Sequence, residues 1–423
     1  MYHLFFNRAR QLVTNPTIIA GLLFSFFSFV NRGFSFLLLL ILANFISPKE
    51  YGYLSLFSTI TMLIGFFIAF SSEGYLSVAY FKDGKDGIKK TFSSVFLTSN
   101  VFMLLCTLVI YFGGDIISCY VEISKENLYV ALFISYFTLY ANLNLDLFRL
   151  EEKVYRYGWF SCSNALLNFV LSIVLVKNLL LGWEGRIYAQ IICFFIFGIL
   201  GLYYFWKKGY IGFPCLEYWK KIMIWGLPLI PHLATSFIRQ GCDRFIINSY
   251  HSISDVGLFS FALNLANIIM MLGLGLNQAN SVNIYKILGD TSTDKSKKNY
   301  AIHRQQIKNI MFLAILSVLI IILCIFVIPL LAPQYEHAMK YFPLLSVYSF
   351  LFCLYLLYTN VLFFYGKTRL IMYITFGSSL IHLLLSYTFT RYSLFYTCWI
   401  YVLTQGLVVM GIMFFSKKLL KLK

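Results

Sequence analysis

The sequence predicts an all-α membrane protein with about twelve transmembrane helices. Of its 423 residues, 60% are hydrophobic and only 12% are charged, whereas roughly a quarter of the residues in an average soluble domain are charged. Uncharged runs of about 20 residues recur along the whole chain, and a helix of that length crosses about 30 Å of hydrocarbon. A water-soluble fold of this size would need far more charge to cover so much apolar surface.

These runs define twelve expected spans, six in each half of the chain. The first six lie at 22–45, 54–74, 92–113, 127–148, 157–176 and 186–206. The second six lie at 222–242, 256–276, 309–331, 341–365, 370–390 and 394–416. We therefore expect an N-terminal lobe over 1–206, a cytoplasmic linker over 207–221, and a C-terminal lobe over 222–423 that ends in a basic cytoplasmic tail.

The formal net charge of +17 fits a membrane protein better than a nucleic-acid-binding protein. The basic residues form short clusters between the apolar runs, as the positive-inside rule describes, and do not gather into one basic domain. With the N-terminus inside, 25 of the 34 basic residues fall in segments on the cytoplasmic side. We expect both termini to be cytoplasmic and no nucleic acid among the partners.

The nine cysteines include no C-x-x-C pair and mostly lie in or beside apolar runs. We expect them to pack as small apolar groups, with no metal site and no disulfide. The first apolar run begins late and continues as a full-length span, which differs from a cleavable signal peptide.

Two short motifs recur at corresponding places in the two halves. Residues 47–55 (SPKEYGYLS), after the first span, resemble residues 252–260 (SISDVGLFS), after the seventh. Residues 144–153, after the fourth span, align loosely with 360–369, after the tenth. Units of six spans in the same order and from the same side imply two six-helix lobes related by a parallel repeat about an axis along the membrane normal.

Polar residues three or four apart share one helix face in several spans. Most Ser, Thr and Asn side chains of this kind join helices by hydrogen bonds. Arg32 is different, because a cation near the middle of a span costs roughly 2.5–3.5 kcal/mol; we expect it to face a buried partner, a water-filled cavity or an anionic ligand. The polar stripes comprise Ser25, Ser28, Arg32 and Ser35; Ser135, Thr138, Asn142 and Asp146; Ser161, Asn164, Asn168 and Ser172; His232, Ser236, Arg239 and Asp243; Ser260, Asn264 and Asn267; and Ser378, His382 and Ser386.

The seventh span carries Pro228 and Pro231 near one end. Each proline removes a backbone donor and clashes with the preceding turn, so we expect this helix to be kinked or locally unwound. A static kink and a gating hinge both fit this pattern.

Several short segments carry a resemblance to a known family. They are 46–52 (ISPKEYG), 147–149 (LFR), 182–185 (GWEG), 227–231 (LPLIP), 243–247 (DRFII) and 256–260 (VGLFS). In these segments the sequence resembles the polysaccharide transporter family of the multidrug/oligosaccharidyl-lipid/polysaccharide superfamily, and within it the Wzx-type O-antigen or capsule repeat-unit flippases.

The resemblance implies a flippase for undecaprenyl-diphosphate-linked oligosaccharide repeat units, working by alternating access in the bacterial cytoplasmic (inner) membrane. It implies transport for the biosynthesis of O-antigen (lipopolysaccharide) or another surface polysaccharide. The implied partners are the lipid-linked oligosaccharide, membrane lipid, and the polymerase and chain-length regulator of the same pathway. It implies no catalytic residue and no cofactor, and it makes coupling to a proton or sodium gradient an expectation.

The resemblance also suggests roles for particular side chains. A guanidinium binds phosphate through two parallel hydrogen bonds, so Arg32 is the first choice for the diphosphate and Arg239 the second. We expect sugar hydroxyls to meet Asn142, Asn164, Asn168, Asn264 and His382. We place a gate or outer rim at Pro228, Pro231, Asp243 and Arg244, with Arg244 paired to Asp243 or Asp255. Glu73 and His382 are the candidates for ion coupling, since histidine titrates near neutrality.

Other functions remain open at this point. A polymerase or glycosyltransferase would need catalytic acid or base groups, but the expected external loops are short and hold few carboxylates. A multidrug or cation exporter of the same superfamily would need an acidic or aromatic cavity, whereas Arg32 and Arg239 make this one cationic. A flippase for a lipid-linked peptidoglycan precursor usually carries extra spans. We expect a transporter and not an enzyme.

Overall fold

The computed structural model describes residues 16–290, 292 and 294–422. The described residues are helical almost throughout and form no strand. By length and composition, eleven of their helices are suited to cross a membrane, and the broken pair Leu216–Leu229 and Leu233–Tyr250 makes twelve if it counts as one span. The predicted number of spans is confirmed. Residues 1–15, which precede the first span, lie outside the described part of the structure. The prediction that the N-terminus is cytoplasmic concerns these residues.

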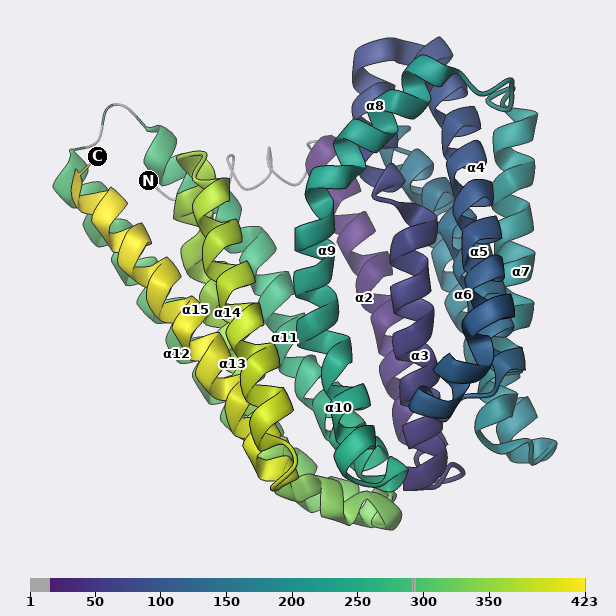
Figure 1. Ribbon diagram of the computed structural model, residues 1–423. Helices are drawn as coiled ribbons and strands as arrows, with labels where there is room; N and C mark the ends of the chain where they lie inside the picture. Colours follow the sequence, from purple (N-terminus) through teal and green to yellow (C-terminus); the bar gives the residue numbers. More distant parts are fainter. Residues whose placement is uncertain (1–15, 291, 293, 423) are drawn as a thin grey trace. The chain divides into compact units, whose positions relative to one another are not determined.

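The helices follow one another with short connections (Figure 1). The first half contains α2 (Pro16–Leu42), α3 (Pro48–Ala69), α4 (Ser72–Val121), α5 (Lys125–Leu150), α6 (Val154–Ile173), the π-helical η1 (Val174–Asn178) and α7 (Gly182–Lys207). Next come α8 (Leu216–Gly226), the 3-10 turn η2 (Leu227–Leu229), α9 (Ile230–Phe237), the π-helical η3 (Ile238–Cys242) and α10 (Asp243–Tyr250). The chain ends with α11 (Ile253–Gly289), α12 (Lys295–Leu331), η4 (Pro333–Lys340), α13 (Phe342–Phe364), α14 (Thr368–Phe389) and α15 (Leu394–Leu422).

Internal contacts divide the chain into two units. Unit 1 comprises the residues up to Ile46 together with Phe57–Ile230, and unit 2 comprises Ser47–Leu56 and the residues from Pro231 onward. These bounds separate groups of residues that contact one another. The lobe boundaries expected at residues 206 and 222 stay a prediction.

In unit 1, α5 packs against both α4 and α7, and α2 packs on α6 (Figure 1). The α5–α7 contact is close, because a Cβ added to Gly201 would lie 2.5 Å from the backbone oxygen of Tyr140. Glycine at such a position lets two helix backbones approach within a membrane protein. α4 is kinked at Gly84, where φ is +63°; the second and third expected spans lie on either side of this residue.

In unit 2, α13 packs against α11, α12 and α15, and α14 packs against α15 (Figure 1). The buried side chains Ile269, Leu313, Cys353 and Leu357 form one core cluster where α11, α12 and α13 meet. In the same unit, α10 packs against α14. The buried polar groups described below lie at that contact.

The repeated motif forms the same local structure twice in unit 2. Ser47 and Glu50 bond reciprocally at the start of α3, with the Ser47 N–H donating to Glu50 at 2.9 Å and the Glu50 N–H donating to Ser47 at 3.3 Å. Ser252 and Asp255 form the corresponding capping box at the start of α11. A serine cap followed three residues later by an acid is a helix-start signal that satisfies two orphan donors.

The two motifs also pack against each other through their glycines. A Cβ at Gly52 would lie 2.1 Å from the backbone oxygen of Ile253, and one at Gly257 would lie 1.8 Å from that of Pro48. The two helix starts therefore touch backbone to backbone. The sequence similarity between the motifs thus has a physical cause, because each supplies a capped helix start and a glycine for the same contact.

Candidate functional site

The polar stripe of α2 divides between a packed face and an exposed face. Toward α6, the Ser28 hydroxyl lies 3.2 Å from that of Tyr157, and the Asn31 amide donates a 2.8 Å hydrogen bond to Ser161. These bonds join the two helices, as expected for small polar residues in a bundle. They also set the rotation of α2 within unit 1.

Arg32 lies on the face of α2 that unit 1 leaves exposed, together with Ser25 and Ser35. Phe26 and Phe29, which are 58% and 60% exposed, follow on the adjoining part of the same surface. With about 3.6 residues per turn, the polar and aromatic groups form two neighbouring strips. One strip is polar and the other aromatic, and whether Arg32 faces an aqueous cavity stays a prediction.

A cluster of acids and amides lies where α4 and α5 meet in unit 1. Glu73 bonds with Asn142 and lies within electrostatic reach of Asp146 and Arg149. The Arg149 guanidinium is 3.0 Å from the Asp146 carboxylate. Two residues expected to have different roles, Glu73 and Asn142, thus share one site, and Asn142 is exposed.

Asn168 on α6 is held by an arginine that the sequence analysis did not single out. Arg186 on α7 donates to the Asn168 side-chain oxygen and, at 2.8 Å, to the Ser172 hydroxyl. Asn164, one turn before Asn168, is half-buried. Arg186 could have been noticed in the sequence, because it follows the GWEG segment directly and is a basic residue at the start of an apolar helix.

Asp243 and His382 require a correction. An outer-rim acid should be exposed and a sugar-binding histidine should be free, yet both side chains are only 2% exposed and the His382 Nε2 lies 2.8 Å from the Asp243 Oδ2. The other ring nitrogen of His382 lies 3.0 Å from the Thr404 hydroxyl. A position along a helix can be read from the sequence, but the direction in which that helix is turned depends on its neighbours.

The arginines of the seventh span bond to neutral groups. Arg239 donates to Gln405 at 2.7 Å, and Arg244 donates to Ser260 at 3.0 Å and to the backbone oxygen of Gln240. The Asp243 carboxylate bonds to His382 and Ser386, and the expected pairing of Arg244 with Asp243 or Asp255 stays a prediction.

Asn264 also bonds within unit 2, where its amide donates to the Tyr51 hydroxyl at 2.6 Å. That bond joins α11 to the start of α3, so it strengthens the contact between the repeated motifs. The side chain of His232, in the seventh-span stripe, lies outside the described part of the structure.

Polar residues of the last span were missed by the sequence analysis. Thr397, Thr404 and Gln405 on α15 are fully buried. Their spacing of seven and eight residues places them on one helix face, and this regular spacing in an otherwise apolar span was the available signal.

The predicted kink of the seventh span is confirmed as a break between two helices. Pro228 lies in the 3-10 turn η2, Pro231 lies in α9, and a π-helical segment, Ile238–Cys242, follows before Asp243. The helix geometry therefore changes repeatedly along this span, and whether the changes serve a gate stays a prediction.

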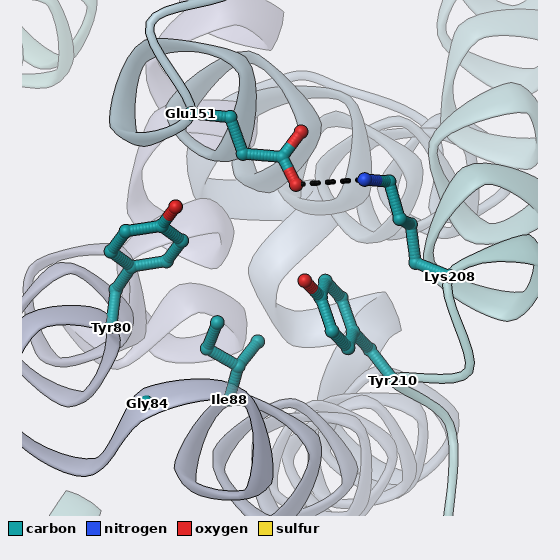
Figure 2. A pocket seen from close by; sticks show the side chains of 6 residues that line it. All are labelled: Tyr80, Gly84, Ile88, Glu151, Lys208 and Tyr210. Atoms are coloured by element: carbon teal, nitrogen blue, oxygen red, sulfur yellow. Dashed lines mark hydrogen bonds and ion pairs between the residues drawn. The ribbon is translucent and has the colours of Figure 1, made fainter.

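Unit 1 also contains a cavity of about 320 Å³ beside the kink of α4. Figure 2 shows Glu151 and Lys208 facing each other across it, with their charged atoms 3.0 Å apart. Lys153 forms a second ion pair with Glu151. Burial raises the pKa of Glu151, but the hydrogen bonds and charges of the two lysines outweigh burial and hold that pKa below its ordinary value of 4.5. The cavity is lined by Tyr80, Gly84, Ile88, Glu151, Lys208 and Tyr210.

Replacing Glu151 by glutamine is expected to destabilise the protein by about 1–2 kcal/mol, since two lysines lose a charged acceptor. Because the folded-state pKa of Glu151 is lowered, its contribution is fully present above about pH 4.5 and is lost as the pH falls through the lower folded-state value. Thermal unfolding of the purified protein at several pH values measures the effect. The control is Glu152→Gln, which changes the exposed neighbouring acid; an equal loss of stability in the control would contradict the prediction.

The long apolar helices and the polar groups buried among them define the class of the protein as a multi-pass membrane protein. The chain belongs to the family described as "Polysaccharide biosynthesis protein", which matches residues 20–282. Residues 228–388 also match the MatE family.

Several known proteins are similar over most of the chain. The "Lsg locus putative protein 1" of Haemophilus influenzae is 26% identical over 371 residues, which cover 84% of this chain and 87% of the relative. A multidrug resistance MATE family transporter of the MOP superfamily, in an inward-facing conformation, superposes with a TM-score of 0.73 at 16% identity, covering 90% of this chain and 95% of its own. The lipid II flippase MurJ, in an inward closed conformation, gives 0.73 at 16% identity, covering 94% and 87%.

These likenesses confirm the fold class: an all-α membrane protein with about twelve transmembrane helices in two six-helix lobes. They also confirm the resemblance on which the family expectation rested. By family the protein is a transporter and not an enzyme.

Proposed function

We propose that the protein is a flippase for undecaprenyl-diphosphate-linked oligosaccharide repeat units, serving the biosynthesis of O-antigen or another surface polysaccharide. The observation that carries this proposal is Arg32, a cation in a membrane-spanning helix that lies on an exposed polar strip. Membership of the polysaccharide biosynthesis family supports the same class of cargo.

A guanidinium on that strip suits a diphosphate for electrostatic and geometric reasons. An arginine left in hydrocarbon is costly, so a face that carries one is expected to line water or a ligand. Its forked donors match two oxygens of one phosphate group. The cargo's lipid tail can stay in the bilayer beside the aromatic strip of Phe26 and Phe29, while its diphosphate meets Arg32.

The hydrophilic glycan needs amide and hydroxyl partners. Asn142, which is exposed beside its bond with Glu73, and Asn164, which is half-exposed, are the proposed partners of sugar hydroxyls in unit 1. Within unit 2, Arg239 remains the second choice for the diphosphate, and it donates to Gln405. His382, being buried and bonded on both ring nitrogens, is withdrawn from the sugar-binding set.

The proposed setting is the bacterial cytoplasmic membrane with both termini in the cytoplasm, as the distribution of basic residues indicates. Rocking of the two lobes would expose the site to one side and then the other, as in other transporters built from repeats. The polymerase and chain-length regulator of the same pathway are the proposed functional partners.

The test is translocation in proteoliposomes that contain a fluorescent undecaprenyl-diphosphate oligosaccharide. With the protein present, glycan in the inner leaflet should become accessible to an externally added glycosidase, whereas in protein-free vesicles the inner-leaflet glycan should stay protected, because a polar glycan does not cross hydrocarbon unaided. A fluorescent cation and lipid II serve as competing cargoes in parallel vesicles. Transport of the cation without the oligosaccharide would favour an exporter, and transport of lipid II alone would favour a peptidoglycan flippase.

A further inference from the structure

The cavity beside the kink of α4 plays no part in the proposed binding of the oligosaccharide. Its walls come from three segments of unit 1: α4 supplies Tyr80, Gly84 and Ile88, Glu151 follows α5, and Lys208 and Tyr210 follow α7. Its volume of about 320 Å³ is at the lower end of the range of ligand pockets, about 300–1,000 Å³. The cavity therefore suits a small polar group and not a whole oligosaccharide.

Two tyrosine hydroxyls at this cavity are open to a ligand. Tyr210 is only 6% exposed, and neither its hydroxyl nor that of Tyr80 forms a hydrogen bond with another residue in the described part of the chain. Figure 2 shows the two rings on opposite sides of the cavity, with the Tyr210 hydroxyl directed into it. A buried hydroxyl without a hydrogen bond is destabilising, so a group that accepts from these hydroxyls would stabilise the cavity.

The charged groups around the cavity have a positive sum. Burial alone would lower the pKa of Lys208, but its hydrogen bond and charge interaction with Glu151 outweigh burial and raise that pKa above its ordinary value of 10.5. Lys153 forms the second ion pair with Glu151. Arg156 donates to the Tyr204 hydroxyl, which in turn donates to the same carboxylate. Three cations thus surround one acid, and their field favours an anion.

The cavity lies at a membrane boundary of unit 1. Glu151 stands between the end of α5 and the start of α6, and Lys208 directly follows the end of α7. Exposed aromatic side chains lie on the adjoining turns, namely Phe81, Tyr155, Trp159, Tyr203 and Trp206. Trp and Tyr gather at the level of the lipid headgroups, and the distribution of basic residues predicts that this end is cytoplasmic. We therefore expect the cavity at the depth of the cytoplasmic headgroups.

We infer that this cavity binds the headgroup of an anionic phospholipid that carries hydroxyl groups, as phosphatidylglycerol does. The phosphate accepts from the Lys208 ammonium and from the hydroxyls of Tyr80 and Tyr210, and a headgroup hydroxyl donates to Glu151. Basic pockets between transmembrane helices on the cytoplasmic side are known to bind anionic headgroups. The inference goes beyond the proposed transport of oligosaccharide and does not depend on it.

The Glu151 carboxylate has room for that hydroxyl. Its Oε2 atom accepts from Lys153 and from Tyr204 at 3.1 Å, whereas its Oε1 atom accepts from Lys208 at 3.0 Å. A carboxylate offers about four acceptor positions, two on each oxygen. A hydroxyl on Oε1 would therefore fill the remaining position without breaking either ion pair.

The charge of the cavity favours a lipid phosphodiester over a diphosphate or a free phosphate. Lys208 is the one cation among the described residues that line it, and Glu151 faces it. One ammonium and two hydroxyls match the single charge of a phosphodiester, whereas a diphosphate would bring a second negative charge close to the carboxylate. A lipid tail also suits the exposed Phe81, whose ring lies 5.3 Å from that of Tyr80.

Native mass spectrometry of the full-length protein in detergent tests the inference, with dihexanoylphosphatidylglycerol as the probe. The difference between wild type and Lys208→Gln isolates the cavity from lipid bound elsewhere. We expect Lys208→Gln to bind the probe at least about tenfold more weakly, since it loses a hydrogen bond to a charged group. The matched control is Lys207→Gln, which removes an exposed charge from the neighbouring position and should bind as wild type does. Equal affinities in the three proteins would overturn the inference.

A tyrosine variant keeps the test decisive if Lys208→Gln is poorly folded. Tyr210→Phe removes only the hydroxyl, and the loss of one hydrogen bond should weaken binding of the probe about three- to tenfold. Tyr203→Phe removes an exposed hydroxyl near the end of α7 and should leave the affinity unchanged. Wild-type affinity in Tyr210→Phe, or equal weakening in both variants, would contradict the assigned contact.

Three further probes separate the possible sources of the phosphate. Dihexanoylphosphatidylcholine has the same tails and phosphate but a cationic headgroup without hydroxyls, so it should bind at least about tenfold more weakly; equal binding would overturn the choice of headgroup. Displacement of the probe by an equal concentration of inorganic phosphate would reassign the cavity to a soluble anion. Displacement by an undecaprenyl-diphosphate oligosaccharide would reassign it to the cargo. None of these measurements involves transport, so failure of the proposed function would leave their outcome unchanged.

Discussion

Arg32→Ala is expected to abolish surface glycan in cells and to lower the initial rate of oligosaccharide translocation at least about 100-fold. The estimate assumes two hydrogen bonds from the guanidinium to the diphosphate, each contributing about 1.5–3 kcal/mol as bonds to charged groups. Fold should be little affected, since the Arg32 side chain lies on the exposed face of α2. Surface glycan staining and the proteoliposome assay measure the effect, after membrane levels of the variant are shown to be normal.

The conservative variant separates charge from geometry. Arg32→Lys keeps the charge but not the planar fork, so it should recover only part of the transport rate. Arg391→Ala is the matched control, because it removes an exposed arginine from the turn between α14 and α15 and should transport at the wild-type rate. Wild-type surface glycan in Arg32→Ala would remove this residue from the mechanism.

Gly257→Ala is expected to leave little folded protein in the membrane. The added Cβ would lie 1.8 Å from the backbone oxygen of Pro48 and 3.0 Å from the backbone nitrogen of Gly52. Backbone atoms cannot rotate away as a side chain does, so the starts of α3 and α11 would have to separate. We expect a destabilisation of about 3 kcal/mol or more, a large fraction of the stability of most proteins.

The control for this variant lies on the same helix. A Cβ on Gly275 would have no heavy atom within 4 Å, so Gly275→Ala should change stability by no more than about 1 kcal/mol, in the stabilising direction. Size-exclusion profiles and thermal unfolding of fluorescently tagged variants compare the two. Equal behaviour of Gly257→Ala and Gly275→Ala would show that the motif contact is not needed for folding.

The membrane spans could be predicted closely from the sequence. The expected span 341–365 corresponds to α13 at Phe342–Phe364, and the expected span 370–390 corresponds to α14 at Thr368–Phe389. Length and apolarity belong to a helix by itself, and the bilayer imposes the same requirement on each one. The break of the seventh span was foreseen for a similar reason, since proline acts on its own turn.

The candidate site was only partly predictable. The sequence identified Arg32, Asp243 and His382 as unusual, because each places a polar or charged group among apolar neighbours. It did not indicate that the last two bond to each other, and it passed over Thr404. Threonine is common in membrane helices, so its role appears only when its partner is known.

The repeated motif was also predictable only in part. Similar letters at 47–55 and 252–260 predicted a duplication, and the capping boxes at Ser47 and Ser252 are local consequences of those letters. The contact between Gly52 and Gly257 is not local. It depends on two helix starts, separated by about half of the chain, meeting at one crossing.

The sequence by itself determined that this protein is a membrane protein of about twelve spans and of duplicated design, because hydrophobic length, proline and capping residues act within a few turns of a helix. Only the tertiary structure decided that Arg32 remains on an exposed face while Asp243 is buried against His382. The physical reason is that the rotation of a helix about its axis is set by the packing and hydrogen bonds of its neighbours, which lie far away in the chain.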